Sequence, residues 1–198
     1  MNKLRKICLV FGVILIAAAL VLSVFNLYDS YRAGEKARTV ASMLNDYIED
    51  APHTSSVRLT DYRRVPGAEM PAHEIEGVGY IGKLDIPQLG LSLPVADSWS
   101  YDALSLAPCR YSGSVTEKNL VICAHNYGTH FGRLSELSPD SQLLFTDCEG
   151  NRTLYRLADT EELAPEDIER MTDSGYDLTL FTCNWNGTAR FTLRYMIV

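Results

Sequence analysis

Three side chains of types used in covalent catalysis stand at the ends of apolar runs. Cys183 ends the run LTLFTC, His125 ends the run LVICAH, and Arg190 begins the run RFTLRYMIV. A thiolate attacks carbonyl carbons, an imidazole passes protons near neutral pH, and a guanidinium keeps its charge while donating several hydrogen bonds. Cys183, His125 and Arg190 are therefore the candidate nucleophile, acid/base and anion stabiliser of an acyl-transfer reaction.

Local sequence alone brings the thiol and the guanidinium together. Six residues separate Cys183 from Arg190, and they include Asn186-Gly187, a dipeptide typical of tight turns. If the flanking runs form an antiparallel hairpin, Cys183 and Arg190 face each other at its mouth. Arg194 has the same facing by alternation but lies deeper along the strand, so Arg190 is preferred for the anion role and Arg194 is the alternative.

Short strands must position these residues. Runs of β-branched, aromatic and aliphatic residues, separated by glycine, proline and asparagine, predict an all-β fold that closes or nearly closes into a barrel. The expected strands are Tyr80–Ile86, Leu91–Val95, Leu120–His125, Leu143–Asp147, Thr153–Ala158, Leu178–Thr182 and Phe191–Val198. Short helices are expected at Tyr101–Ala107, near Arg133–Leu137, and at Pro165–Met171, with Pro165 in its first turn.

The order of these motifs resembles the sortase family. The segment TLFTC, Thr179–Cys183, matches the signature around that family's cysteine, with a histidine at an earlier strand end and an arginine starting the next strand. YIGKLDIP, from Tyr80, and LSLPV, from Leu91, are similar to the family's opening strands. The likeness covers Gly77–Val198, the domain assigned here to catalysis.

The resemblance implies a closed eight-stranded sortase β-barrel and a cysteine transpeptidase of Gram-positive bacteria. Cys183 would cleave an LPXTG-like C-terminal sorting signal of a surface protein and hold it as a thioester, which an amine of a peptidoglycan precursor or a pilin would release. Thr182 would position the substrate, and Asp159–Gly175 would line its apolar pocket, with Leu163, Ile168 and Met171 as candidates. No cofactor or metal is implied.

Two further features of the sequence bear on which class of sortase the chain resembles. The short loop after Cys183 departs from the better-known classes, and a sole N-terminal anchor differs from the pilus-building class. We therefore expect a class B-like or class D-like member.

The N-terminal region predicts a membrane anchor. Ile7–Leu27 is an uncharged apolar run of 21 residues, long enough to span a bilayer. Lys3, Arg5 and Lys6 precede it, which places the N-terminus in the cytoplasm and the rest outside. A cleaved signal peptide is the alternative, but its apolar region is usually shorter.

Three regions follow from this reading. Residues 1–28 form the basic N-terminus and transmembrane helix, 29–76 form a juxtamembrane amphipathic helix and a linker from Ala51 to Glu76, and 77–198 form the catalytic barrel. The amphipathic pattern ends at Asp50, and the linker is rich in proline.

Composition narrows the alternatives. The 46% apolar content suffices for a core, and the net charge of −7, with mixed signs along the chain, argues against nucleic acid as a partner. The four cysteines outside the anchor could form two disulfides, but they are not closely paired and a domain of this size needs none.

Two rival functions use the same residues. A hydrolytic extracellular cysteine peptidase would have the same thiol and imidazole, and product analysis with an added amine separates it from a transpeptidase. A zinc-binding or disulfide-held adhesion module would use Cys123, His125, His130 and Cys183. Otherwise His130 is expected in a solvated loop, and His53 and His73 receive no role.

Overall fold

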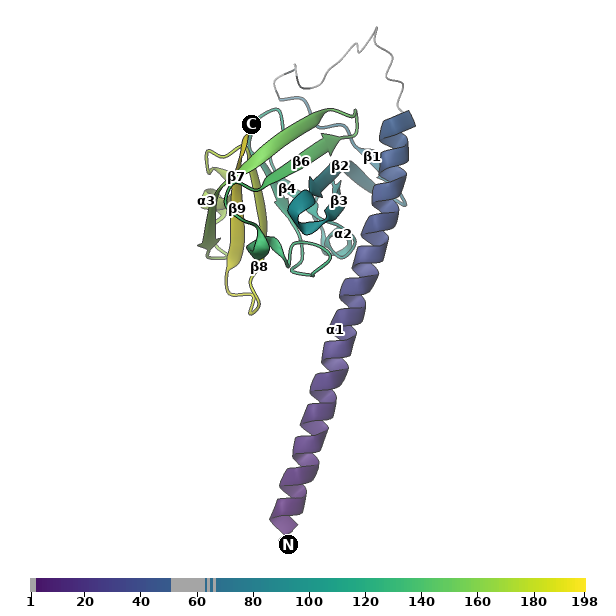
Figure 1. Ribbon diagram of the computed structural model, residues 1–198, viewed down its shortest axis with the longest axis vertical. Coiled ribbons are helices and arrows are strands. Elements are labelled where there is room, and N and C mark those ends of the chain that lie inside the picture. Colours follow the sequence, from purple (N-terminus) through teal and green to yellow (C-terminus); the bar gives the residue numbers. More distant parts are fainter. Residues whose placement is uncertain (1–2, 51–62, 64, 66) are drawn as a thin grey trace. The chain divides into compact units, whose positions relative to one another are not determined.

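The computed structural model describes residues 3–50, 63, 65 and 67–198 (Figure 1). His53 and much of the predicted linker lie outside the described residues. The chain divides into two compact units, Met1–Arg32 and Ala33–Val198. The first unit is helical throughout its described residues.

Helix α1 (Lys3–Asp50) covers the predicted transmembrane helix and the predicted juxtamembrane helix, which ends at Asp50. The side chains of its apolar run are exposed, and the helix is long and apolar enough to cross a membrane. From Ala33 onward, within the second unit, the helix buries one face at spacings of three and four residues. That face consists of Ala33, Ala37, Val40, Ala41, Leu44 and Ile48.

Nine strands form one sheet in the described residues. They are β1 (His73–Ile75), β2 (Val78–Ile86), β3 (Leu91–Ala96), β4 (Cys109–Ser112), β5 (Leu120–Cys123), β6 (Gln142–Asp147), β7 (Arg152–Leu163), β8 (Leu178–Cys183) and β9 (Arg190–Ile197). Their order is β1-β2-β3-β4-β5-β8-β9-β7-β6, and β6 also pairs with β2. The pairing of β2 with β6 closes eight strands into a barrel and confirms the predicted fold class, with β1 added at the edge of β2.

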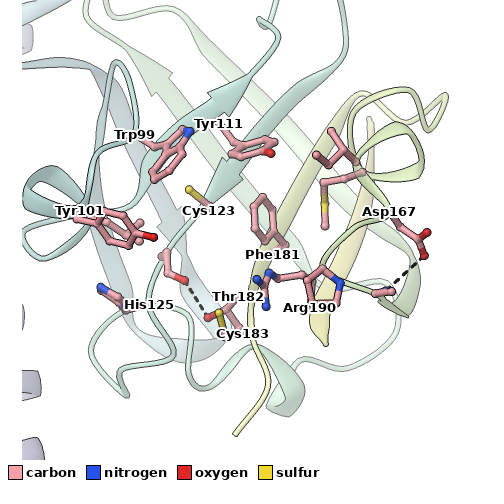
Figure 2. A pocket seen from close by; sticks show the side chains of 16 residues that line it. Trp99, Tyr101, Tyr111, Cys123, His125, Asp167, Phe181, Thr182, Cys183 and Arg190 are labelled. Carbon is pink, nitrogen blue, oxygen red and sulfur yellow. Dashed lines mark hydrogen bonds between the residues drawn. The ribbon is translucent and has the colours of Figure 1, made fainter. Parts of the chain in front are cut away.

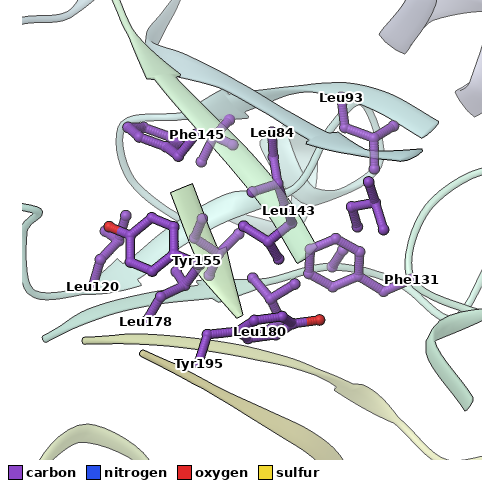
Figure 3. Packing of buried hydrophobic residues seen from close by; sticks show 14 of the residues in the cluster. Leu84, Leu93, Leu120, Phe131, Leu143, Phe145, Tyr155, Leu178, Leu180 and Tyr195 are labelled. Carbon is purple, nitrogen blue, oxygen red and sulfur yellow. The ribbon is translucent and has the colours of Figure 1, made fainter. Parts of the chain in front are cut away.

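The barrel interior holds the main hydrophobic core. Figure 3 shows Leu84, Leu120, Phe145, Leu180 and Tyr195 packing together from strands on different sides of the barrel. A second cluster lies where Val40, Leu44 and Ile48 of α1 pack against Ile75 and Tyr80. The second half of α1 is thus part of the barrel's packing.

Gly34 of α1 packs against Thr129 in the loop that follows β5. A Cβ atom added at Gly34 would lie 2.6 Å from Thr129 Cγ2 and 2.8 Å from Thr129 Cβ. Only a residue without a side chain fits there, so this contact fixes how the helix meets that loop.

The short helices near Tyr101, Arg133 and Ile168 have other bounds than predicted, and a further one, at Pro87–Leu89, was not predicted. They are η2 (Pro87–Leu89), α2 (Tyr101–Leu104), η3 (Leu134–Glu136) and α3 (Ile168–Thr172). Pro165 therefore precedes α3 rather than standing in its first turn. A turn intervenes, in which Asp167 N donates to Ala164 O at 3.1 Å and Asp167 Oδ2 accepts from Ala164 N at 3.3 Å.

Candidate active site

Two parts of the barrel bring the predicted catalytic residues to one edge. β8 ends at Cys183, β9 begins at Arg190, and the two residues are paired across the antiparallel strands. β5 runs parallel to β8 with Cys123 opposite Phe181, and His125 follows two residues after its end. His125, Cys183 and Arg190 line one cavity of about 340 Å³, in which Figure 2 shows all three side chains.

The connection between β8 and β9 holds the hairpin ends in register. Asn184 N donates to Ala189 O at 3.0 Å, and Asn184 Oδ1 accepts from Ala189 N at 3.2 Å. Gly187 has φ +74°, a left-handed conformation that favours glycine. Arg190 Nη1 makes long bonds to the carbonyls of Gly187 and Ala189, at 3.3 and 3.4 Å. Most of the guanidinium's donors remain for the cavity.

Thr182 connects the cysteine strand to the histidine loop. Its Oγ1 donates to Ala124 O at 2.8 Å, and the residue is buried while also lining the cavity. Thr182 therefore holds together the two backbone segments that carry Cys183 and His125. Its predicted contact with substrate stays a prediction.

The loop carrying His125 is packed by aromatic rings. The His125 ring centroid lies 4.9 Å from that of Tyr127, which lies 5.7 Å from that of His130. Phe131 N donates to His125 O at 3.2 Å. The expectation that His130 is solvated is wrong, because its side chain is fully buried beneath this loop.

Burial of His130 predicts a pH-dependent stability. Burial, and then the nearby His125, lower the pKa of His130 from its usual 6.5 to about 4. The unfolded chain therefore binds a proton before the folded one does, and stability is lost as the pH falls from about 6.5 to 4, on the order of 3 kcal/mol in all. Denaturant melts between pH 7 and 4 should show this loss, and His130→Gln should flatten the slope while His73→Gln retains it. Equal slopes for the three proteins would contradict the assignment.

The cavity walls are largely apolar. Ile168 and Met171, two of the predicted substrate contacts, lie on one wall. Leu163, the third, is buried behind that wall against Met171 and Val121. The other wall consists of residues that the sequence analysis did not select, Trp99, Tyr101, Leu104, Tyr111 and Phe181. The aromatic pair Trp99 and Tyr101 next to a turn was the available signal.

Arg194 occupies a different environment from Arg190. It is fully buried and is absent from the cavity lining. Its Nη1 donates to Thr179 Oγ1 at 2.7 Å and to Met171 O at 3.2 Å, and its Nε donates to Glu161 Oε1 at 2.9 Å. Arg194 ties α3 to strands β7 and β8 of the barrel, which leaves Arg190 as the arginine that faces the thiol.

The five cysteines are free thiols, and their exposure separates them. Cys183 and Cys8 are exposed, whereas burial raises the pKa of Cys109, Cys123 and Cys148 to about 12. Within the described residues no three His, Cys, Asp or Glu side chains gather as a metal site would require. The four residues considered as zinc ligands, Cys123, His125, His130 and Cys183, therefore do not form a metal site in the described residues.

The difference among the thiols predicts selective alkylation. In a Cys8→Ser background, iodoacetamide should modify the native protein once, at Cys183, and reach the three buried thiols only after unfolding, because thiolate and access are both required. Peptide mass spectrometry before and after addition of denaturant checks this. Native labelling of Cys109, Cys123 or Cys148 at the rate of Cys183 would contradict it.

Comparisons of this chain with known proteins find similar proteins in one family. A family model described as the sortase domain matches residues 84–198. Sortase A of Bacillus anthracis is 27% identical over 189 residues, which are 92% of this chain and 89% of that protein. The structure of Clostridium perfringens sortase C with the C-terminal cell wall sorting motif aligns at TM-score 0.55 and 18% identity, over 87% of this chain and 89% of the other. A sortase D5 transpeptidase of Clostridium perfringens aligns at TM-score 0.53 and 18% identity, over 60% of this chain and 79% of the other.

Proposed function

Since the chain belongs to the sortase family, a family of cysteine transpeptidases, we propose that it cleaves a C-terminal sorting signal through a thioester on Cys183 and transfers the protein to an amine. The observation that carries the proposal is the meeting of Cys183, His125 and Arg190 in one cavity at the barrel edge. These residues supply a nucleophile, a proton carrier and an anion-binding group to one cavity.

The first half-reaction forms the thioester. The Cys183 thiolate attacks the scissile carbonyl carbon, and the negative charge that develops on its oxygen is stabilised by the Arg190 guanidinium. His125, as imidazolium, donates a proton to the departing amine, so the C–N bond breaks and a neutral amine leaves. His125 is then neutral and Cys183 carries the acyl group.

The second half-reaction reverses the proton flow. An acceptor amine attacks the thioester carbonyl and gives a proton to neutral His125, while the C–S bond breaks and its electron pair returns to the Cys183 sulfur. The products are a new amide and the original pair of thiolate and imidazolium.

The substrate proposed is an LPXTG-like sorting signal. The apolar side chains of Ile168 and Met171 on one wall, and of Phe181 and Tyr111 on the other, suit the leucine and proline of such a signal. Thr182 is proposed to position the peptide next to the thiol. A class B-like or class D-like assignment remains part of this proposal.

We propose that residues 1–28 anchor the enzyme in the cell membrane with the N-terminus inside, and that 77–198 act as the extracytoplasmic catalytic domain after the 29–76 connection. Exposed apolar side chains along the first unit and the basic residues before them support the anchor. The acyl acceptor is a peptidoglycan precursor or a pilin amine at the cell surface.

The proposal is tested by incubating the full chain in detergent micelles with a panel of sorting-signal peptides. Intact mass spectrometry should detect a peptide adduct on Cys183, and an added amine should convert the product from acid to amide. Acid alone at saturating amine would support the rival hydrolytic peptidase. Absence of any Cys183 adduct across the panel would overturn the transpeptidase proposal.

A further inference from the structure

Cys183 borders a second cavity as well as the one already described. This cavity has a volume of about 210 Å³ and shares Thr182 and Cys183 with the first. Neither His125 nor Arg190 lines it. The rest of its lining comes from the β8–β9 connection, the loop after His125 and the ends of β7 and β9: Asn126, Phe131, Gly132, Ser135, Glu162, Asn184, Trp185 and Phe191.

Strand register explains why two cavities meet at one cysteine. Glu162 of β7 is paired with Phe191 of β9, which is paired with Thr182 of β8. Paired residues project to the same face of a sheet, so these three side chains form a row on the face that carries the interior core residue Leu180. Phe181 and Cys183 alternate to the opposite face, which carries the first cavity. A second reactant can therefore reach a thioester on Cys183 from the barrel mouth, through the second cavity.

The charge of the second cavity favours a cation. Glu162 is the one charged side chain in its described lining, and it is exposed. Its neighbour Glu161 is engaged elsewhere, with Arg194 and Arg170 at 2.9 and 2.7 Å. Among the described residues no ion pair involves Glu162. A carboxylate at the wall of a cavity that reaches the thioester sulfur would attract an ammonium group.

We propose that this second cavity is the acceptor site, in which Glu162 binds the protonated primary amine that later attacks the thioester; the inference rests on the proposed function. The bound ammonium loses one proton to water, and the neutral nitrogen forms the C–N bond. The C–S bond breaks, its electron pair returns to Cys183, and the second nitrogen proton passes to His125. Glu162 acts by binding and takes no part in the bond changes.

Trp185 also lines this acceptor site. Its side chain is 96% exposed at the β8–β9 connection, an unusual position for an indole unless it meets a partner. An aromatic side chain in the lining of the same cavity as Glu162 would add to the attraction for a cationic amine and offer a surface for the carbon chain that carries it.

The test separates charge recognition from the chemistry of the thioester. The full chain is first acylated with a sorting peptide, and two acceptors are then titrated, glycinamide, which is largely cationic near pH 7.5, and hydroxylamine, which is neutral there. Glu162→Gln should raise the ratio of the glycinamide KM to the hydroxylamine KM about 5- to 10-fold, the size expected for a lost charge-assisted hydrogen bond. The matched control is Glu74→Gln, an exposed carboxylate on β1 outside both cavities, which should leave that ratio unchanged.

The outcomes distinguish this inference from the function on which it rests. An unchanged KM ratio in a Glu162→Gln protein that still forms the Cys183 thioester would overturn the acceptor site and leave the transpeptidase proposal in place. Failure of the unaltered protein to form a thioester with any sorting peptide would overturn both. Thermal melts of the two variants establish that each is folded before the KM values are compared.

Discussion

Replacing Cys183 with alanine is expected to abolish thioester formation and to lower peptide cleavage by at least about 10⁴-fold, as loss of a covalent nucleophile does. His125 and Arg190 remain in the cavity, but neither can hold the acyl group. The Cys183 side chain is exposed at a strand end, so its sulfur adds little to the core and the melting temperature should change little. Intact mass spectrometry with a sorting peptide and a thermal melt measure both effects.

The matched control for Cys183→Ala is Cys148→Ala. Cys148 is a buried thiol that donates to Tyr80 O at 2.9 Å and lies outside the described lining of both cavities at Cys183. That variant should lose some stability and keep its adduct on Cys183. A Cys183→Ala protein that still accumulates a covalent peptide adduct would show that the nucleophile is another residue.

The parts of the fold that could be predicted are those with a clear local signal. β8 and β9 alternate in polarity and flank a tight turn, so their pairing and the opposition of Cys183 and Arg190 follow from a few neighbouring residues. β2 and β3 are also bounded by turn residues and were expected near their observed limits.

Other elements depend on distant partners. The second half of β7 contains Asp159, Thr160, Glu161 and Glu162, which do not alternate in polarity, yet it is a strand because it pairs with β9. β1 and β4 have three and four residues and lie outside any longer run of strand-forming residues, so they were missed. Closure of the barrel through β2 and β6 joins segments that no local rule connects.

The residues of the candidate site also divide into those with a local sequence signal and those that depend on distant parts of the fold. His125, Cys183 and Arg190 could be selected as candidates because chemically distinctive side chains stood at strand ends, and the structure places all three in the lining of one cavity. The burial of His130 and the wall formed by Trp99 and Tyr111 depend on how loops fold over the barrel, which residue spacing does not encode. The sequence could only favour Arg190 over Arg194 for the anion role, because alternation makes both side chains face the same side of the strand.

Substitution of Arg190 should lower activity, whereas substitution of Arg194 should lower the stability of the fold. Arg190→Ala removes the guanidinium that faces the thiol, so kcat/KM for a sorting peptide should fall about 10²- to 10³-fold, as for the loss of an oxyanion donor, with little change in melting temperature. Arg190→Lys should recover part of this loss, because a point charge remains but the planar fork of donors does not.

Arg194→Ala should instead destabilise the fold by about 3 to 5 kcal/mol. It leaves the carbonyl of Met171 and the hydroxyl of Thr179 without their donor, and Glu161 without one of its two arginine partners. Urea melts of both variants, with kcat/KM measured at a temperature where each is folded, separate the two effects. If folded Arg194→Ala loses more kcat/KM than Arg190→Ala, then the anion-stabilising group is Arg194, and the geometry of the thioester site must be redrawn around the interior of the β8–β9 hairpin.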